Sequence, residues 1–268
     1  MKNVTLVSSL FNINRERVDG REWKEYLKWF EITLKLKSQM VLFVSKDIQD
    51  FVEERRIEIP TEIYVQTMEE VPYAYLEEKL STIINSDDYK NKISDPNRIE
   101  CKYSFYSIIQ FSKFKWLEKA ISENHFNSDY FFWIDAGASR FIEDYSFEDQ
   151  FPTHSAVEAL EAMGEKFLLQ MNTECYADLH SSDKLDDSYL LDNRSYVCGT
   201  FFGGHKNAIE KVSQEVENVL LNKMIKNNII NNEQIVLGYL LKNKPEYFEY
   251  YMRTNWRQIA LFEELCKK

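Results

Sequence analysis

The chain has 268 residues, 44 % of them hydrophobic, which is enough for a large buried core. Its formal net charge of -11 argues against a general nucleic-acid-binding protein, because affinity for a phosphate backbone depends on clustered Lys and Arg. The four cysteines form no CxxC pair, so neither a zinc knuckle nor a disulfide framework is indicated, and a reducing cytosol fits best. Because the sequence holds no linker or repeat, we predict one domain over residues 1–268.

Six apolar runs rich in β-branched and aromatic residues predict strands. In chain order, they lie at residues 4–10, 40–45, 62–67, 130–135, 167–172 and 196–202. Several runs lack the alternation of a half-exposed strand, as expected for strands covered on both faces.

Helical periodicity lies between these runs. Apolar residues share one helical face in four segments, at 23–34, 73–83, 105–121 and 209–220, and the segment 233–242 is apolar on nearly all sides. Strands that alternate with helices predict an α/β fold, with a mainly parallel central sheet flanked by helices.

The predicted strand at 130–135 ends in Asp135, followed by Ala136 and Gly137. In open α/β sheets, ligands bind beyond the carboxyl ends of the strands. A carboxylate there needs a divalent cation, an Arg or Lys, or backbone N–H groups to offset its desolvation. Asp135 therefore either holds Mg2+ or Mn2+ beside a diphosphate, with Ala136 and Gly137 leaving room for the ligand, or caps the turn that follows.

The pair Gly203-Gly204 is expected between the last predicted strand and the helix after it. Two glycines at such a junction allow positive φ and close approach of an anionic ligand to the helix N-terminus. The alternative is a tight connection that binds nothing. The segment matches neither a P-loop nor a GxGxxG fingerprint.

The last predicted helix begins with the sequence NNEQ. Asn231 or Asn232 suits the N-cap and Glu233 suits the helix dipole, so capping alone explains these residues.

Five cations are candidates for contact with phosphates: Arg15, Arg17, Arg21, Lys113 and Arg140. The alternative is that these side chains are simply solvated, as most Lys and Arg are. The four histidines show no HExxH spacing and GxSxG is absent, which argues against a zinc hydrolase and a serine hydrolase.

Taken together, these segments resemble the bacterial HtrL/YibB family, also called WlaTC/HtrL, which is associated with glycosyl transfer and lipopolysaccharide gene clusters. The resemblance is carried by VTLVSSLFNINR, EEVPY, SKFKWLEKA, NHFNSDYFFWIDAGASRF, GTFFGG and NNEQIVLGYLLKNKP. More distantly, the order of the parts is similar to the GT-A fold of nucleotide-diphospho-sugar transferases. The resemblance implies a single GT-A-like, Rossmann-like domain.

The GT-A resemblance also implies roles for individual residues. The nucleotide position is taken by Ser9, Phe11, Asn12 and Arg15. Asp135 matches the first carboxylate of a metal-binding DxD motif, whereas the second position is Gly137. Either Mn2+ or Mg2+ on Asp135 neutralises the diphosphate, or Arg140, Lys113 or the loop from Arg15 to Arg21 does so instead.

Glu233 and Gln234 match a later segment of GT-A enzymes that lies near the reacting sugar. A carboxylate at Glu233 could take the acceptor proton as a general base, whereas Gln234 could only hydrogen-bond.

The function implied is glycosyl transfer from a UDP-linked or other nucleotide-diphospho-sugar donor to a lipopolysaccharide, lipooligosaccharide or capsule glycan. Such an enzyme would work in the cytoplasm, in peripheral contact with the inner membrane. Two alternatives stay open. One is a sugar nucleotidylyltransferase, whose usual Gly-rich N-terminal loop is missing, and the other is a noncatalytic carbohydrate- or nucleotide-binding protein.

Overall fold

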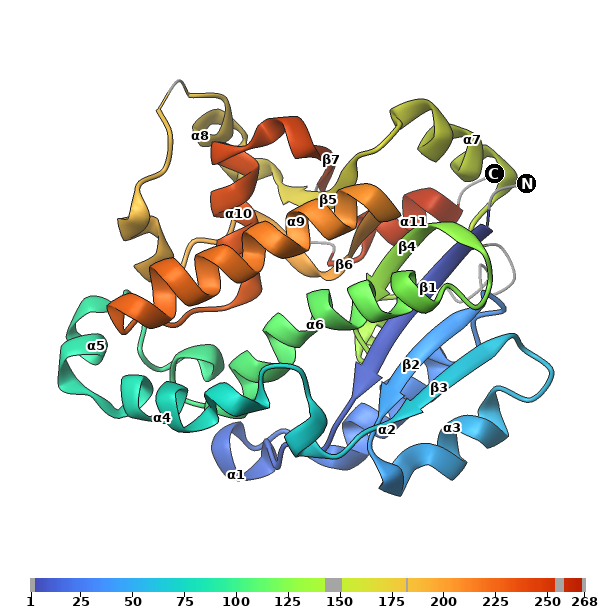
Figure 1. Cartoon of the computed structure of the whole chain (residues 1–268), viewed down its shortest axis with the longest axis horizontal. Helices are drawn as coiled ribbons and strands as arrows, with labels where there is room; N and C mark the ends of the chain where they lie inside the picture. Colours follow the sequence, from blue (N-terminus) through green and yellow to red (C-terminus); the bar gives the residue numbers. More distant parts are fainter. Residues whose placement is uncertain (1–2, 143–150, 182, 254–257, 267–268) are drawn as a thin grey trace.

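The computed structural model describes residues 3–142, 151–181, 183–253 and 258–266. Within these residues, the strands form one seven-stranded sheet in the order β3-β2-β1-β4-β6-β5-β7 (Figure 1). The strands are β1 (Asn3–Leu10), β2 (Met40–Val44), β3 (Thr61–Val65), β4 (Ser128–Ile134), β5 (Phe167–Asn172), β6 (Val197–His205) and β7 (Phe248–Arg253).

The sheet is mainly parallel. β1 pairs in parallel with β2 and β4, β2 with β3, and β5 with β7. Only β6 runs against its two neighbours, β4 and β5, among the described strands. This arrangement confirms the predicted α/β fold with its mainly parallel central sheet.

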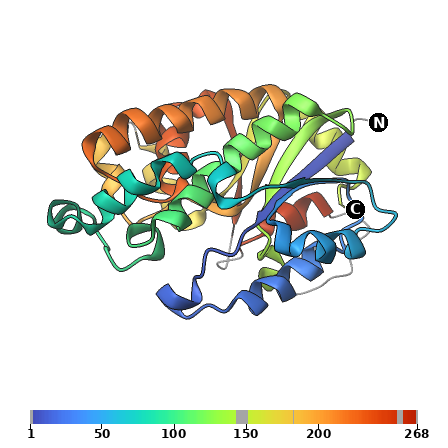
Figure 2. The same ribbon diagram turned by 60° about the horizontal axis from the view of Figure 1, so that its bottom comes forward.

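Helices cover both faces of the sheet, as Figure 2 shows for α6 and α9 on one side and α2 and α3 on the other. The first layer holds α4 (Glu77–Asn85), α5 (Asp87–Lys92), α6 (Ser104–Glu123), α9 (Lys206–Asn218) and α10 (Glu233–Asn243). The second layer holds α2 (Trp23–Thr33), α3 (Gln49–Arg55), α7 (His154–Met163) and α11 (Ala260–Cys266). Two short helices, α1 (Glu16–Asp19) and α8 (Tyr176–His180), complete the set. In the described part of the chain, none of the helices has the length and apolar character needed to cross a bilayer.

Neighbouring residues of the central strands enter opposite cores. Val7 and Trp133 pack into the core under α6 and α9, whereas Leu6 and Ile134 pack into the core under α2 and α11. Because both faces of these strands are covered, their sequences need no polar positions. This is the physical reason for the uninterrupted apolar runs.

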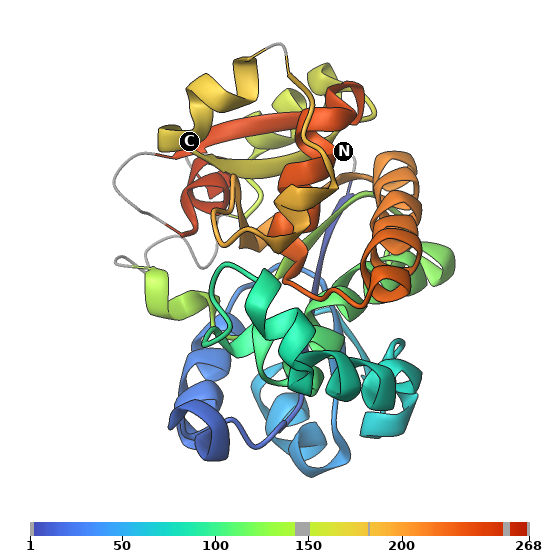
Figure 3. The ribbon, with the colours of Figure 1, turned by 90° about the vertical axis from the view of Figure 1, so that its left-hand side faces the viewer.

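The sequence does not predict β7, which lies beside β5 at the edge of the sheet (Figure 3). Its Glu249 interrupts the apolar pattern, and the Met252 side chain is 44 % exposed. An edge strand needs less apolar surface than a central one, and so it gives a weaker signal.

The predicted position of Gly203 and Gly204 is wrong. Both lie inside β6, and α9 begins only after His205. A Cβ on Gly203 would lie 2.1 Å from the backbone oxygen of Phe131, and one on Gly204 would lie 2.2 Å from that of Lys166. The two glycines therefore allow neighbouring backbone, rather than a ligand, to approach closely.

Candidate functional site

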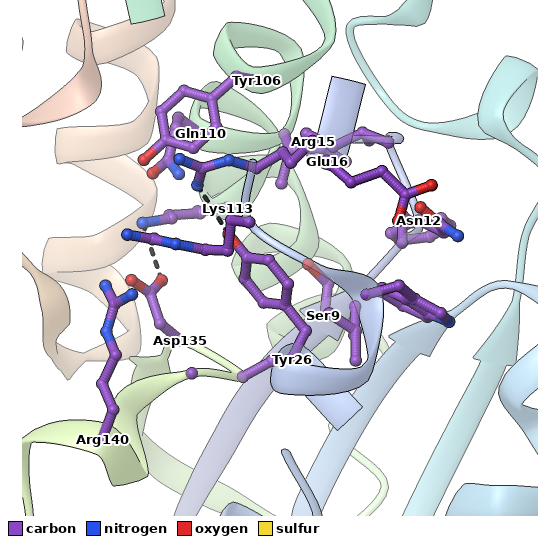
Figure 4. A pocket seen from close by; sticks show the side chains of 18 of the residues that line it. Ser9, Asn12, Arg15, Glu16, Tyr26, Tyr106, Gln110, Lys113, Asp135 and Arg140 are labelled. Carbon is purple, nitrogen blue, oxygen red and sulfur yellow. Dashed lines mark hydrogen bonds and ion pairs between the residues drawn. The ribbon is translucent and has the colours of Figure 1, made fainter. Parts of the chain in front are cut away.

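A pocket opens beyond the carboxyl ends of β1 and β4 (Figure 4). It contains about 830 Å³ of empty space when its open mouth is included. Ten residues predicted from the sequence line it: Ser9, Phe11, Asn12, Arg15, Arg21, Lys113, Asp135, Ala136, Gly137 and Arg140. Five predicted residues lie outside this lining: Arg17, Gly203, Gly204, Glu233 and Gln234.

The loop after β1 is held in a fixed shape. The side chain of Asn12 accepts a hydrogen bond from the backbone N–H of Asn14 at 2.9 Å, which turns the chain toward α1. The ring of Phe11 stacks on Trp116 with 5.6 Å between centroids. At the end of β1, the buried Ser9 hydroxyl has no hydrogen-bond partner in the described structure, so a ligand could satisfy it.

Arg15 returns from this loop into the pocket. Its guanidinium donates to the hydroxyl of Tyr26 at 2.7 Å, pairs with Asp19, and lies 4.8 Å from the ring centroid of Tyr106. Burial alone would lower the pKa of Arg15, but Asp19 and the two tyrosines outweigh burial and raise it. Arg15 is therefore a fixed positive charge in the wall.

Asp135 occupies the predicted end of its strand. Its Oδ1 accepts a hydrogen bond from the Trp133 indole N–H at 2.7 Å and pairs with the Lys113 ammonium at 2.9 Å. No described backbone N–H of the following turn bonds the carboxylate, so it does not cap that turn. Because both contacts use Oδ1, Oδ2 is the oxygen that remains for a ligand.

Lys113 connects Asp135 to a second carboxylate. Its ammonium is 2 % exposed and also contacts Glu233 Oε1 at 2.8 Å and the backbone oxygen of Gly199 at 3.1 Å. Burial by itself would lower the pKa of Lys113, but the carboxylates of Asp135 and Glu233 raise it. Lys113 is therefore a buried ammonium held by two anions, and it is already neutralised before any phosphate arrives.

Glu233 lies behind Lys113 and is 1 % exposed. Burial raises its pKa, although Lys113 opposes that effect. The N-cap of α10 is Asn232, whose side chain accepts from the backbone N–H of Ile235 at 3.0 Å, so the capping interpretation holds for Asn232. Neither Glu233 nor the half-buried Gln234 lines the pocket, so the structure does not place a general base there beside a ligand.

Gly199 makes room for this buried pair. A Cβ at this position would lie 2.2 Å from Glu233 Oε1 and 2.9 Å from the Gln234 side chain. Only glycine allows the carboxylate to approach β6 so closely. Sequence reasoning missed Gly199, although a glycine inside a predicted buried strand is a signal of close approach.

Several aromatic residues that line the pocket were not predicted as site residues from the sequence, among them Tyr26, Tyr106 and Trp133. Their apolar rings fit the helical and strand patterns that predict a core. Their N–H and O–H groups could have indicated a site, because a buried Tyr or Trp needs a hydrogen-bond partner for its polar group.

The remaining cations of the pocket are Arg21 and Arg140. Arg140 points toward Asp135 in Figure 4, and its guanidinium lies 5.2 Å from the ring centroid of Trp29. Desolvation, and then the positive charge of Arg21, lower the pKa of Arg140.

The side chains present do not fit a protein-built metal site. Across the described ranges, no group of three or more His, Cys, Asp and Glu side chains could hold a metal ion. The carboxylates that line the pocket are Asp135 and Glu16, and Asp135 already forms an ion pair with the Lys113 ammonium. Mg2+ and Mn2+ need several oxygen ligands, so the predicted Asp135 metal site lacks protein partners.

Comparison with known proteins places the chain in a family. A model of the HtrL_YibB family, described as a bacterial protein of unknown function, matches residues 2–263. The chain belongs to this family, which confirms the resemblance seen in the sequence. Among curated protein sequences, none matches significantly.

Solved structures give more distant likenesses. A 4-diphosphocytidyl-2C-methyl-D-erythritol synthase from Anaerococcus prevotii is 13 % identical with a TM-score of 0.41, covering 96 % of this chain and 91 % of its own. A Mycobacterium tuberculosis protein solved with manganese is 6 % identical with a TM-score of 0.40, covering 100 % and 99 %. Mouse xyloside xylosyltransferase 1 is 9 % identical with a TM-score of 0.40, covering 98 % and 92 %. At such low TM-scores, a functional proposal has to rest on the pocket itself.

Proposed function

We propose that this protein is a glycosyltransferase that uses a nucleotide-diphospho-sugar donor, UDP-linked in the first instance. The observation that carries the proposal is the composition of the pocket, where four cations meet two carboxylates at the carboxyl ends of β1 and β4. The cations are Arg15, Arg21, Lys113 and Arg140, and the carboxylates are Glu16 and Asp135. A ligand with a negatively charged centre and uncharged ends suits this arrangement, and a nucleotide-sugar has that form.

The nucleoside end of the donor fits the wall made by the loop after β1. Phe11 and Asn12 are fixed there, and the unsatisfied Ser9 hydroxyl can hydrogen-bond the ligand. Tyr26 and Tyr106 add aromatic surface on which flat rings can pack. On the opposite wall, Ala136 and Gly137 carry little side chain and leave room for the diphosphate.

Asp135 is the residue we assign to the sugar end of the donor. Because Lys113 and Trp133 hold Oδ1, Oδ2 can accept hydrogen bonds from ribose or sugar hydroxyls in one orientation. In the reaction, the bond from the anomeric carbon to the diphosphate oxygen breaks, the acceptor hydroxyl oxygen forms the new bond, and the hydroxyl proton passes to the leaving diphosphate. Negative charge grows on the leaving diphosphate as the sugar becomes oxocarbenium-like, and the cationic wall stabilises that charge.

In this proposal, Glu233 acts on the site indirectly, by holding the Lys113 ammonium that contacts Asp135. It contacts the ammonium at 2.8 Å, and the ammonium contacts Asp135 at 2.9 Å. Glu233 is therefore a positioning residue rather than the general base that the family resemblance implies. Gln234 follows Glu233 in the first turn of α10, and we assign it a positioning role as well.

We place the protein in the cytoplasm, with a lipopolysaccharide, lipooligosaccharide or capsule precursor as the acceptor at the inner membrane. All four cysteines are buried free thiols, which supports a reducing compartment.

Incubation of the purified protein with UDP-sugars, followed by measurement of released UDP, tests the proposed function. Slow UDP release that ceases in Asp135→Ala supports glycosyl transfer. Pyrophosphate exchange into a sugar nucleotide would instead show a nucleotidylyltransferase. Tight binding without turnover, with donor and acceptor panels both present, would show a binding protein.

A further inference from the structure

Two arginines from different parts of the chain lie against one indole ring in the pocket wall. Arg21 precedes α2, and Arg140 lies in the short helix η5 (Ala138–Phe141) after β4. Their guanidinium carbons lie 5.9 Å and 5.2 Å from the ring centroid of Trp29. Both side chains line the pocket, so the indole supports two positive charges that face the same space.

Among the described residues, Asp135 attracts the Arg140 guanidinium without forming an ion pair with it. In the residues that the structure describes, no carboxylate forms an ion pair with Arg21 or Arg140. The two charges also repel each other, and Arg21 is the second cause, after desolvation, of the lowered pKa of Arg140. Two neighbouring cations without an ion-paired carboxylate favour the binding of an anion between them.

The elements that carry the pair are locked together. The Ser139 hydroxyl donates to the backbone oxygen of Trp29 at 2.7 Å, and the Thr33 hydroxyl donates to that of Ala136 at 3.1 Å. A Cβ on Gly137 would already contact the Trp29 ring at 3.4 Å. Because η5 is pressed against α2, the two arginines are held ready for a ligand rather than gathered by it.

The other two cations of the pocket are occupied. Lys113 is held by Asp135 and Glu233, and Arg15 is paired with Asp19. Arg21 and Arg140 are therefore the two pocket cations that form no ion pair with a described carboxylate. One guanidinium group can donate two parallel hydrogen bonds to two oxygens of a phosphate.

We propose that Arg21 and Arg140 hold the diphosphate of the donor in place of a divalent cation, so that the donor binds without metal. This inference rests on the proposed function, and it assigns to two arginines the role that a DxD motif and its Mn2+ or Mg2+ would have. The positive charges match the two negative charges of a nucleotide-sugar diphosphate. The absence of a second carboxylate at Gly137 then has a physical reason. A carboxylate there would lie near the two guanidinium groups and would compete with the diphosphate for them.

Binding measurements test the inference independently of catalysis. Isothermal titration with UDP, GDP, ADP, dTDP and inorganic pyrophosphate is done in excess EDTA and again with Mg2+ or Mn2+. We expect at least one of these diphosphates to bind equally well in both conditions. Arg21→Gln and Arg140→Gln should each weaken that binding by roughly 10- to 100-fold, as expected for loss of charged hydrogen bonds.

Arg55→Gln is the matched control. Arg55 also stacks on an aromatic ring, 3.6 Å from the centroid of Phe51, but it pairs with Glu31 and lies outside the pocket lining. It should leave binding unchanged, and Arg140→Lys should retain more affinity than Arg140→Gln because charge is kept.

Diphosphate binding that requires metal, or that survives both arginine substitutions, overturns the inference but leaves glycosyl transfer standing. Metal-free, arginine-dependent binding without any sugar transfer supports the inference and overturns the proposed function. Failure of every diphosphate to bind overturns both.

Discussion

Replacing Lys113 by Met removes the cation that lies between Asp135 and Glu233 while keeping most of the side-chain volume. At 2.8 Å, the attraction between the ammonium and Glu233 is about 6 kcal/mol for an effective dielectric constant near 20. The cost of burying the ammonium offsets part of that attraction. Loss of one partner of a buried ion pair typically destabilises a fold by about 3–5 kcal/mol, and we expect Lys113→Met to fall in this range.

The loss should depend on pH in a defined direction. Burial already holds the pKa of Glu233 above its ordinary value of 4.5, and removal of Lys113 raises it further. A raised pKa in the folded state means that the folded protein binds the proton more tightly than the unfolded chain does. Stability is therefore retained at low pH and lost as the pH rises, so Lys113→Met should be more damaging at pH ~8 than at pH ~5.

Urea unfolding followed by far-UV circular dichroism at the two pH values measures this effect. The double variant Lys113→Met with Glu233→Gln removes the buried charge from both partners and should recover a large part of the lost free energy of unfolding. A loss below about 1 kcal/mol in Lys113→Met, or no recovery in the double variant, would refute the idea that a buried ion pair supports the site.

Three further outcomes are expected. Asp135→Ala should lower kcat/KM for UDP release by about 100-fold or more. The variant should still melt near the wild-type temperature, because Lys113 keeps Glu233 as its partner. A clearly lower melting temperature would show that Asp135 has a structural role. Gly199→Ala should cost about 1–3 kcal/mol in urea unfolding, since its Cβ would lie 2.2 Å from Glu233 Oε1, and an unchanged midpoint contradicts this. Burial raises the pKa of Glu233, so the wild type should lose stability relative to Glu233→Gln as the pH rises above 4.5. A difference that is constant from pH ~5 to ~8 argues against a raised pKa.

Local patterns were sufficient for most of the sheet and for one side of the site. Buried strands need long apolar runs, and the end of such a run locates Asp135 in the sequence. Because β1 and β4 are parallel neighbours, the loop that carries Arg15 and Arg21 opens at the same edge as Asp135 and Arg140. Topology of this kind follows from the alternation of strands and helices, so these residues could be predicted together.

The part that the sequence could not predict depends on where segments cross. Lys113 and Glu233 are 120 residues apart in the chain, and no local pattern predicts that the Lys113 side chain both lines the pocket and contacts Glu233 of α10. The reversed direction of β6 brings Gly199 beside the pair and moves Gly203 away from the site. Trp29 lies inside the helix predicted at 23–34, and its contact with Arg140 exists only because η5 packs on α2.

Four of the five tryptophans gather around the pocket, and this gives the protein a built-in optical signal. Trp23 and Trp133 line the pocket, Trp29 supports the two arginines, and Trp116 stacks on Trp133 at 6.0 Å. The indole N–H of Trp133 also bonds Asp135, so a ligand that engages this carboxylate changes the surroundings of the emitting ring. The affinity of a ligand for this pocket, and its rates of association and release, can therefore be followed by intrinsic fluorescence without a label.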